Sequence, residues 1–287
     1  MAGLLPRAHS VILRLFIILV LAGAVFGGAY FAVHELYLKP KLELKADKEQ
    51  PRPASPVDPS LPDFKQCEEI LKTAIPTEGV AALERFLRMH PTSPKRDEAR
   101  DRLGELNSAI FFSMQPTDEN TVVVKKGDSL GKIVARTKMP IELIVHLNKL
   151  QKDTIHPGQK LIAFPTNFRL MLKQSQQRVI VYNGDKFFRQ YPTLSWPGKK
   201  PLVPMPKQTT RVTEKVALND KGEPPKPASS QEFTACFHSI GFPISGHSIF
   251  SKADGPAAVS LSGIRLSREH MSEIAVLLPK GATVTLE

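Results

Sequence analysis

The pattern of apolar and polar residues opens with an unbroken apolar run close to the N-terminus. Residues 15–33 contain nineteen consecutive positions without a charged side chain. At about 1.5 Å per residue, a helix of this length nearly crosses a hydrocarbon core of about 30 Å. The run therefore predicts a short tail and a single transmembrane helix within residues 1–34. A cleaved signal peptide is the alternative, because Ala22-Gly23-Ala24 is an acceptable small-residue cleavage site.

Apolar periodicity then disappears and returns with the spacing of helices. Residues 35–62 carry charged side chains and six prolines, which predicts a semi-extended linker. Over residues 63–115, apolar side chains recur three and four positions apart, which favours a few amphipathic helices. Ser93 followed by Pro94 is typical of a helix start. The turn at residues 90–94 resembles that of tetratricopeptide-like hairpins, so this stretch is interpreted as a spacer or partner-docking unit.

Residues 121–164 combine both kinds of periodicity in a short space. The β-branched residues 122–124 favour a strand, and Gly127-Asp128 favours a turn. Asp128 or Ser129 can cap the helix that follows, and a second apolar stripe over residues 141–147 predicts another helix. A last strand after Pro157-Gly158 would complete a small βααβ core.

The remaining residues, 168–287, read mostly as strands. Alternation over residues 168–172 and 178–182, with the turn Asn183-Gly184, predicts a hairpin. The other predicted strands are residues 186–192, 209–216, 233–237 and 282–286, and the one predicted helix is residues 268–278, capped by Ser267. The fold class is therefore a multi-domain α+β chain: an N-terminal transmembrane helix, a short helical segment, a βααβ module and a mostly-β C-terminal domain.

Charge is distributed unevenly along the chain. Residues 1–120 contain 15 Lys and Arg against 16 Asp and Glu, whereas residues 121–287 contain 24 against 12. A basic surface of this kind suits an acidic polymer such as peptidoglycan with its stem carboxylates, and no nucleic-acid-binding motif competes with that interpretation. Neither a cofactor nor a metal site is expected. Cys67 and Cys236 lie in different predicted modules, which leaves a single bridge between them open.

The orientation of the predicted transmembrane helix is ambiguous from charge alone. Two arginines precede the apolar run, and five Lys and Arg follow it before residue 53. Counted by the positive-inside rule, this excess would put the C-terminal side in the cytoplasm. The short N-terminal tail and the modules described below instead require an exported chain. We therefore expect a single-pass protein of the bacterial inner membrane with its bulk in the periplasm or cell wall.

Residues 121–164 resemble the LysM family over its whole length. The family pattern is a strand, a Gly-Asp-Ser/Thr-Leu turn, two short helices, an Asn at the end of the second, and a Pro-Gly-Gln-x-Leu turn into a second strand. Its counterparts here are residues 127–130, Asn148 and residues 157–161. The resemblance implies a shallow groove that binds the N-acetylglucosamine-containing glycan of peptidoglycan. The groove residues it implies are Gly127, Asp128, Ser129 and Leu130 on one side and Asn148, Leu150, Thr154 and Ile155 on the other, although the apolar ones also suit a core.

Residues 168–287 resemble the L,D-transpeptidase catalytic domain. Residues 258–266 lie over the Ser-x-Gly-Cys-Ile-Arg motif of that family, and His247 stands thirteen residues before Ser260, a spacing between catalytic His and motif Ser found in many members. In the family the Cys attacks a stem-peptide carbonyl, the His is its base and the Arg holds the site. This chain has Gly263 at the Cys position and Ser262 at the preceding Gly, while His247 and Arg265 are retained.

The missing nucleophile leads to three hypotheses about function. The leading one is a peptidoglycan-binding envelope protein whose degenerate transpeptidase domain binds stem peptide or a protein partner that the sequence does not name. The second is an active L,D-transpeptidase or related hydrolase in which Ser262 or Cys236 attacks, although a hydroxyl needs far more activation than a thiol. The third is a purely structural tether.

Overall fold

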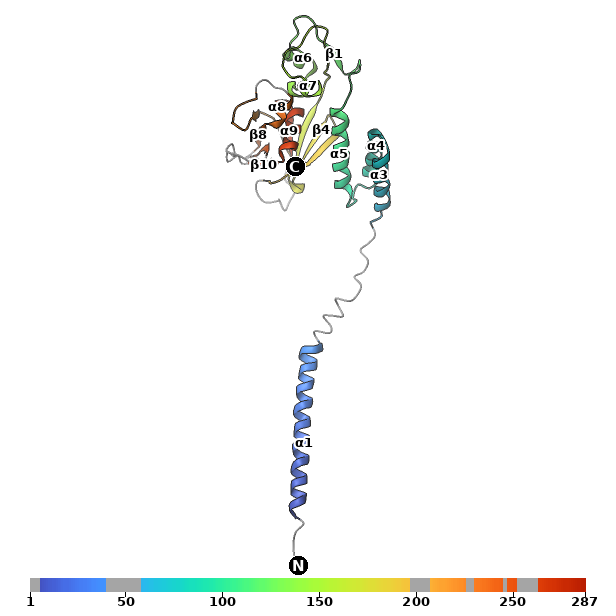
Figure 1. The fold of residues 1–287 in the computed structure, drawn as a ribbon, viewed down its shortest axis with the longest axis vertical. Coiled ribbons are helices and arrows are strands. Elements are labelled where there is room, and N and C mark those ends of the chain that lie inside the picture. The colour runs from blue at the N-terminus through green and yellow to red at the C-terminus, as the bar shows by residue number, and fades with distance from the viewer. Residues whose placement is uncertain (1–5, 40–57, 197–206, 226–229, 245–246, 252–262) are drawn as a thin grey trace, which may run out of the picture. The chain divides into compact units, whose positions relative to one another are not determined.

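The computed structural model describes residues 6–39, 58–196, 207–225, 230–244, 247–251 and 263–287. Residues 1–57 and 58–287 form two separate compact units. In the first, α1 (Pro6–Val33) continues into a π-helical turn, η1 (His34–Leu38) (Figure 1). Residues Leu15–Leu36 have a mean hydropathy of 2.3 and are long and apolar enough to cross a membrane. The predicted linker lies largely outside the described residues.

Three helices open the second unit. They are α3 (Leu61–Thr73), α4 (Pro76–Met89) and α5 (Arg96–Phe112). Phe64, Leu83 and Phe86 are almost fully buried between them, as the helical spacing predicts. The predicted start at Ser93-Pro94 is wrong, because α5 begins at Arg96. Ser93 Oγ instead accepts a hydrogen bond of 2.9 Å from Lys95 N, so it closes the preceding turn.

The next elements form the predicted βααβ module. β1 (Thr121–Val123) pairs antiparallel with β2 (Lys160–Ile162), and α6 (Leu130–Thr137) and α7 (Ile141–Leu147) lie between them in the chain. Ser129 caps α6 by accepting a hydrogen bond of 3.3 Å from Lys132 N. This cap confirms one of the two residues that the sequence offered for it.

A five-stranded sheet with the order β5-β4-β3-β11-β6 forms one half of the C-terminal domain. Its strands are β3 (Phe168–Lys173), β4 (Arg178–Asn183), β5 (Lys186–Pro192), β6 (Gln208–Arg211) and β11 (Thr283–Leu286), and a 3-10 turn, η2 (Gln174–Gln176), joins β3 to β4. The β4–β5 hairpin turns at Gly184, whose φ of 59° favours glycine. This turn is the one predicted from Asn183-Gly184.

A four-stranded sheet with the order β10-β9-β8-β7 forms the other half. Its strands are β7 (Glu214–Leu218), β8 (Phe237–Ile244), β9 (His247–Ser251) and β10 (Ile264–Leu266). β10 runs parallel to β9, and the other pairs are antiparallel. Two helices accompany the sheets, α8 (Ser230–Ala235) and α9 (Arg268–Leu277). Ser267 caps α9 as predicted, by accepting a hydrogen bond of 3.2 Å from His270 N.

Two of the predicted strands differ from the structure. The predicted strand over residues 209–216 is divided between the two sheets. Val212 N donates to Ala282 O at 2.9 Å, whereas Thr213 N donates to Gly241 O at 3.0 Å, so the chain changes sheet between these two residues. The predicted strand over residues 233–237 is wrong, because α8 occupies its first three positions and β8 begins only at Phe237.

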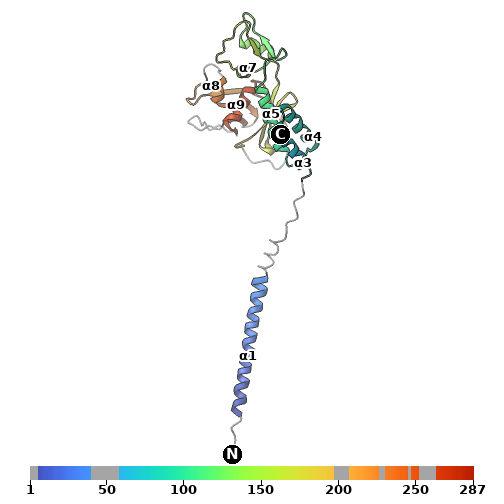
Figure 2. The same ribbon diagram turned by 45° about the vertical axis from the view of Figure 1, so that its right-hand side comes forward.

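One hydrophobic core joins the βααβ module to both sheets of the C-terminal domain. Phe111, near the end of α5, packs edge-on against Phe168 and Phe188, with ring centroids 5.5 and 5.4 Å apart. α5 also packs against α4 (Figure 2). The sequence-based modules therefore share buried surface, and residues 58–287 behave as one compact unit.

Candidate functional site

The two loops predicted to form the glycan groove adjoin each other. Val124 N donates to Gln159 O at 2.9 Å, and Gly158 N donates to Val124 O at 2.8 Å. These bonds hold the loop that follows β1 against the loop that precedes β2. The first loop carries residues 127–130 and the second carries Leu150, Thr154 and Ile155, whereas Asn148 is bonded to Ile162, the last residue of β2.

On the first loop, Asp128 stabilises the turn, and Gly127 leaves open space beside the backbone. Asp128 accepts a hydrogen bond of 2.9 Å from Lys125 N and lies 3.6 Å from an Arg136 guanidinium nitrogen. The bond from the Lys125 amide, with the Arg136 charge, lowers the pKa of the Asp128 carboxyl. Gly127 has a φ of 83° and open space beside its Cα, which suits a close approach by a ligand.

Asn148 connects the end of α7 to β2. Its Nδ2 donates to Ile144 O at 2.8 Å and to Ile162 O at 2.9 Å, and its Oδ1 accepts from Ile162 N at 2.7 Å. The side-chain amide thus bonds both the N–H and the C=O of Ile162, as the backbone of a neighbouring strand would. Asn148 is therefore bound to the scaffold through both polar atoms of its side chain.

The other groove residues fall into two groups. Leu130 is 4% exposed and belongs to the core, and Leu150 and Ile155 are partly buried against it. Thr154 and Ser129, in contrast, are exposed. Of the predicted groove residues, Gly127, Ser129 and Thr154 are thus the exposed ones.

The structure describes only part of the transpeptidase-like site. His247 is the first residue of β9, and its side chain lies outside the described part, as do Ser260 and Ser262. Gly263 directly precedes β10, where the backbone passes close to β9. A Cβ atom added at Gly263 would overlap Ser248 O and would lie 2.8 Å from Ser248 Oγ. Arg265 is exposed, and its backbone bridges to Ser195.

The two cysteines are buried free thiols. Cys236 Sγ donates to Glu232 O at 3.2 Å, and burial raises the pKa of this thiol. Cys67 Sγ donates to Ala82 O at 3.5 Å, and burial raises its pKa as well. A raised pKa keeps a thiol protonated near neutral pH, and a protonated thiol is a poor nucleophile. This environment does not favour Cys236 as a nucleophile.

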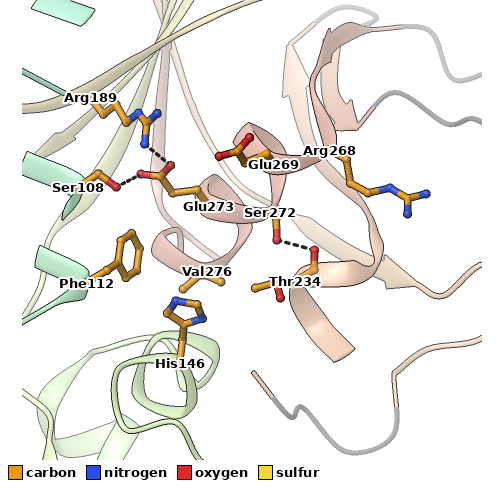
Figure 3. Close-up of a pocket in the computed structure, with 10 residues that line it drawn as sticks. All are labelled: Ser108, Phe112, His146, Arg189, Thr234, Arg268, Glu269, Ser272, Glu273 and Val276. Carbon is orange, nitrogen blue, oxygen red and sulfur yellow. Dashed lines mark hydrogen bonds and ion pairs between the residues drawn. The ribbon is translucent and has the colours of Figure 1, made fainter. Parts of the chain in front are cut away.

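A cavity of about 680 Å³ lies where α5, α7, α8 and α9 meet, beside β5 (Figure 3). The sequence did not predict it, because its lining comes from segments far apart in the chain. Glu273 on α9 accepts a hydrogen bond of 2.6 Å from Ser108 Oγ on α5 and pairs with Arg189 on β5, also at 2.6 Å. The walls include Phe112, Val276 and His146, the last of these from the βααβ module.

Comparison with known proteins identifies the βααβ module. Residues 122–163 match the family model of the LysM domain. A stretch of 51 residues is 43% identical to the probable endopeptidase p60 of Listeria grayi, and it covers 18% of this chain and 10% of that protein. The chain thus spans only a small part of this curated relative. Residues 122–163 are a LysM domain, as predicted, and a LysM domain implies binding to peptidoglycan.

Solved structures similar to this chain include L,D-transpeptidases. The enzyme from Mycobacterium smegmatis matches with 16% identity and a TM-score of 0.29, over 45% of this chain and 63% of that one. A mutant of the Enterococcus faecium enzyme matches with 17% identity and a TM-score of 0.28, over 47% of this chain and 56% of that one. These enzymes belong to the class with the Ser-x-Gly-Cys-Ile-Arg motif, which residues 258–266 of this chain resemble.

Proposed function

We propose that this chain is a membrane-anchored, peptidoglycan-binding protein of the bacterial cell envelope, and that its transpeptidase-like domain is inactive. The observation that carries the binding function is the LysM domain with its two adjoining loops, joined through the backbone of Val124. The exposed polar atoms of these loops suit the hydroxyl and acetamido groups of a glycan.

Anchoring rests on the N-terminal helix. The span Leu15–Leu36 has the length and composition of a transmembrane segment, and none of its side chains is buried in the protein. The LysM domain acts where peptidoglycan is, so the helix would be held in the inner membrane with residues 58–287 in the periplasm or cell wall. From there the LysM domain would bind glycan strands while the C-terminal domain contacts stem peptide or a protein partner.

The inactivity of the C-terminal domain rests on Gly263. In the enzyme family this position carries the thiolate that forms the covalent intermediate, and a hydrogen side chain cannot attack a carbonyl. The local backbone adds a second obstacle, because any Cβ at position 263 would overlap Ser248 O. We therefore expect that a single substitution to cysteine would not restore a nucleophile, because the backbone of β9 lies where the cysteine side chain would begin.

Glycan binding is tested with a tyrosine placed in the groove. Residues 58–287 form a compact unit, so this fragment is mixed with purified peptidoglycan and sedimented. Thr154→Tyr should weaken binding by about tenfold or more, because the ring would fill the exposed side of the groove. Thr77→Tyr, at an exposed threonine of α4, is the matched control and should bind normally. Equal binding by both variants would remove these loops from the site.

Inactivity is tested with a carbapenem, a class of compound that acylates the cysteine of L,D-transpeptidases. Intact-mass spectrometry of residues 58–287 should detect no covalent adduct after incubation. An adduct that disappears in Ser262→Ala or in Cys236→Ala would identify an atypical nucleophile. That result would make the domain an enzyme and contradict the proposal.

A further inference from the structure

The floor of the cavity between the LysM domain and the C-terminal domain is a fixed polar network. The Arg189 and Glu273 side chains are only 16% and 12% exposed, and Ser108 completes the network from a third element. α5 approaches β5 closely at Gly104, where a Cβ atom would lie 2.8 Å from Cγ of Arg189. These side chains are therefore already held in place without a ligand, so that binding costs less conformational entropy.

A ring nitrogen in the wall lacks a partner. His146 Nδ1 is buried and makes no hydrogen bond to any part of the chain that the structure describes. The ring points from α7 toward α9 and lies edge-on to Phe112, with centroids 5.1 Å apart (Figure 3). Burial lowers the pKa of His146, so the ring is neutral near pH 7 and can both donate and accept. A polar ligand group in the cavity would supply the missing bond.

The rim of the cavity carries one charge of each sign. Arg268 and Glu269, at the start of α9, are both exposed. Arg268 lies 3.4 Å from Asp220, whose side chain is itself 84% exposed, so this ion pair is weak. The Glu269 side chain makes no hydrogen bond or ion pair with the residues that the structure describes. The rim thus carries one cation and one anion, whose side chains extend in different directions from the start of α9, beside walls formed in part by Phe112 and Val276 (Figure 3).

We propose that this cavity binds a short peptide that has both a free amino group and a free carboxylate. Arg268 would bind the carboxylate, Glu269 the ammonium group and His146 a backbone amide, while apolar side chains contact Phe112 and Val276. A volume of about 680 Å³ lies within the range of about 300–1,000 Å³ that holds small ligands. The site is separate from the glycan loops, none of which lines the cavity.

Calorimetric titration of residues 58–287 with tri-alanine tests the proposal. Wild type should give saturable binding, and N-acetyl-tri-alanine amide, which has neither charge, should bind at least about tenfold more weakly. Arg268→Gln and Glu269→Gln should each weaken tri-alanine by about fivefold. Arg88→Gln and Glu84→Gln, at exposed positions of α4, are matched controls and should bind as wild type.

A second variant separates this site from the glycan groove. His146→Phe keeps a ring beside Phe112 but removes both ring nitrogens, so it should weaken tri-alanine binding and leave peptidoglycan sedimentation unchanged. No saturable binding of tri-alanine by wild type, or equal binding of the capped peptide, would overturn the proposal. Weakened binding of an N-acetylglucosamine trimer by His146→Phe, with unchanged tri-alanine binding, would assign the cavity to glycan and overturn it as well.

Discussion

Replacing Asn148 with alanine removes three hydrogen bonds, of which one goes back to Ile144 of α7 and two join the end of α7 to Ile162 of β2. Two of the bonded groups are the N–H and C=O of Ile162, a residue that is only 4% exposed. At about 1 kcal/mol for each bond, and with a further penalty for the buried groups left without partners, Asn148→Ala should cost about 3–5 kcal/mol. For a unit of this size that corresponds to a fall in Tm of roughly 6–20 °C.

Thermal unfolding of residues 58–287 and hydrogen exchange at the Ile162 amide measure this loss. The amide should lose protection in Asn148→Ala, because its acceptor is gone. Asn167→Ala is the matched control, since Asn167 is exposed and its side chain makes no hydrogen bond among the described residues. If Asn148→Ala unfolds like the control but no longer sediments with peptidoglycan, Asn148 is a glycan ligand rather than a scaffold residue, and the reasoning is refuted.

Three further predictions follow from the packing and the burial of single residues. Gly263→Ala should lower the free energy of unfolding in urea by about 1–3 kcal/mol, because the new Cβ overlaps Ser248 O. Gly241→Ala is the control and should be tolerated, because its Cβ meets Glu214 at 3.5 Å. Equal effects of the two substitutions would contradict the crowding at position 263. Burial lowers the pKa of His238 to about 4, so its contribution to stability is present above pH 6.5 and lost as pH falls toward 4. In that window the free energy of unfolding of His238→Phe in urea should depend less on pH than that of wild type. The same dependence on pH in both proteins would refute the prediction. A C-terminal reporter that is active only outside the cytoplasm should be active in the full chain, and activity of a cytoplasmic reporter would reverse the orientation.

Features set by neighbouring residues could be predicted from the sequence. The cap at Ser129, the turn at Gly184 and the helix after Ser267 each depend on a few consecutive positions. The LysM domain combines several such signals in 42 residues, which is why its pattern identified it. The start of α5 was missed because a serine hydroxyl can close a turn as readily as it caps a helix, and Ser93 does the former.

Features that depend on distant residues could not be predicted. The alternation at residues 233–237 fits a strand or a short helix equally, and the packing of α8 against α9 favours the helix. The cavity joins Ser108 to Glu273, which are 165 positions apart in the chain, so no local pattern marks it. At position 263 the sequence shows a glycine where the resemblance predicts a cysteine, but only the pairing of β10 with β9 reveals that a side chain has no room there.

The central claim is that this protein binds peptidoglycan without remodelling it. The most direct test incubates residues 58–287 with purified peptidoglycan, sediments the polymer and then analyses its muropeptides. We expect the fragment in the pellet and a muropeptide profile identical to that of untreated peptidoglycan. New cross-links or released peptides would show that the domain is an active enzyme, and a fragment left wholly in the supernatant would show that it does not bind peptidoglycan.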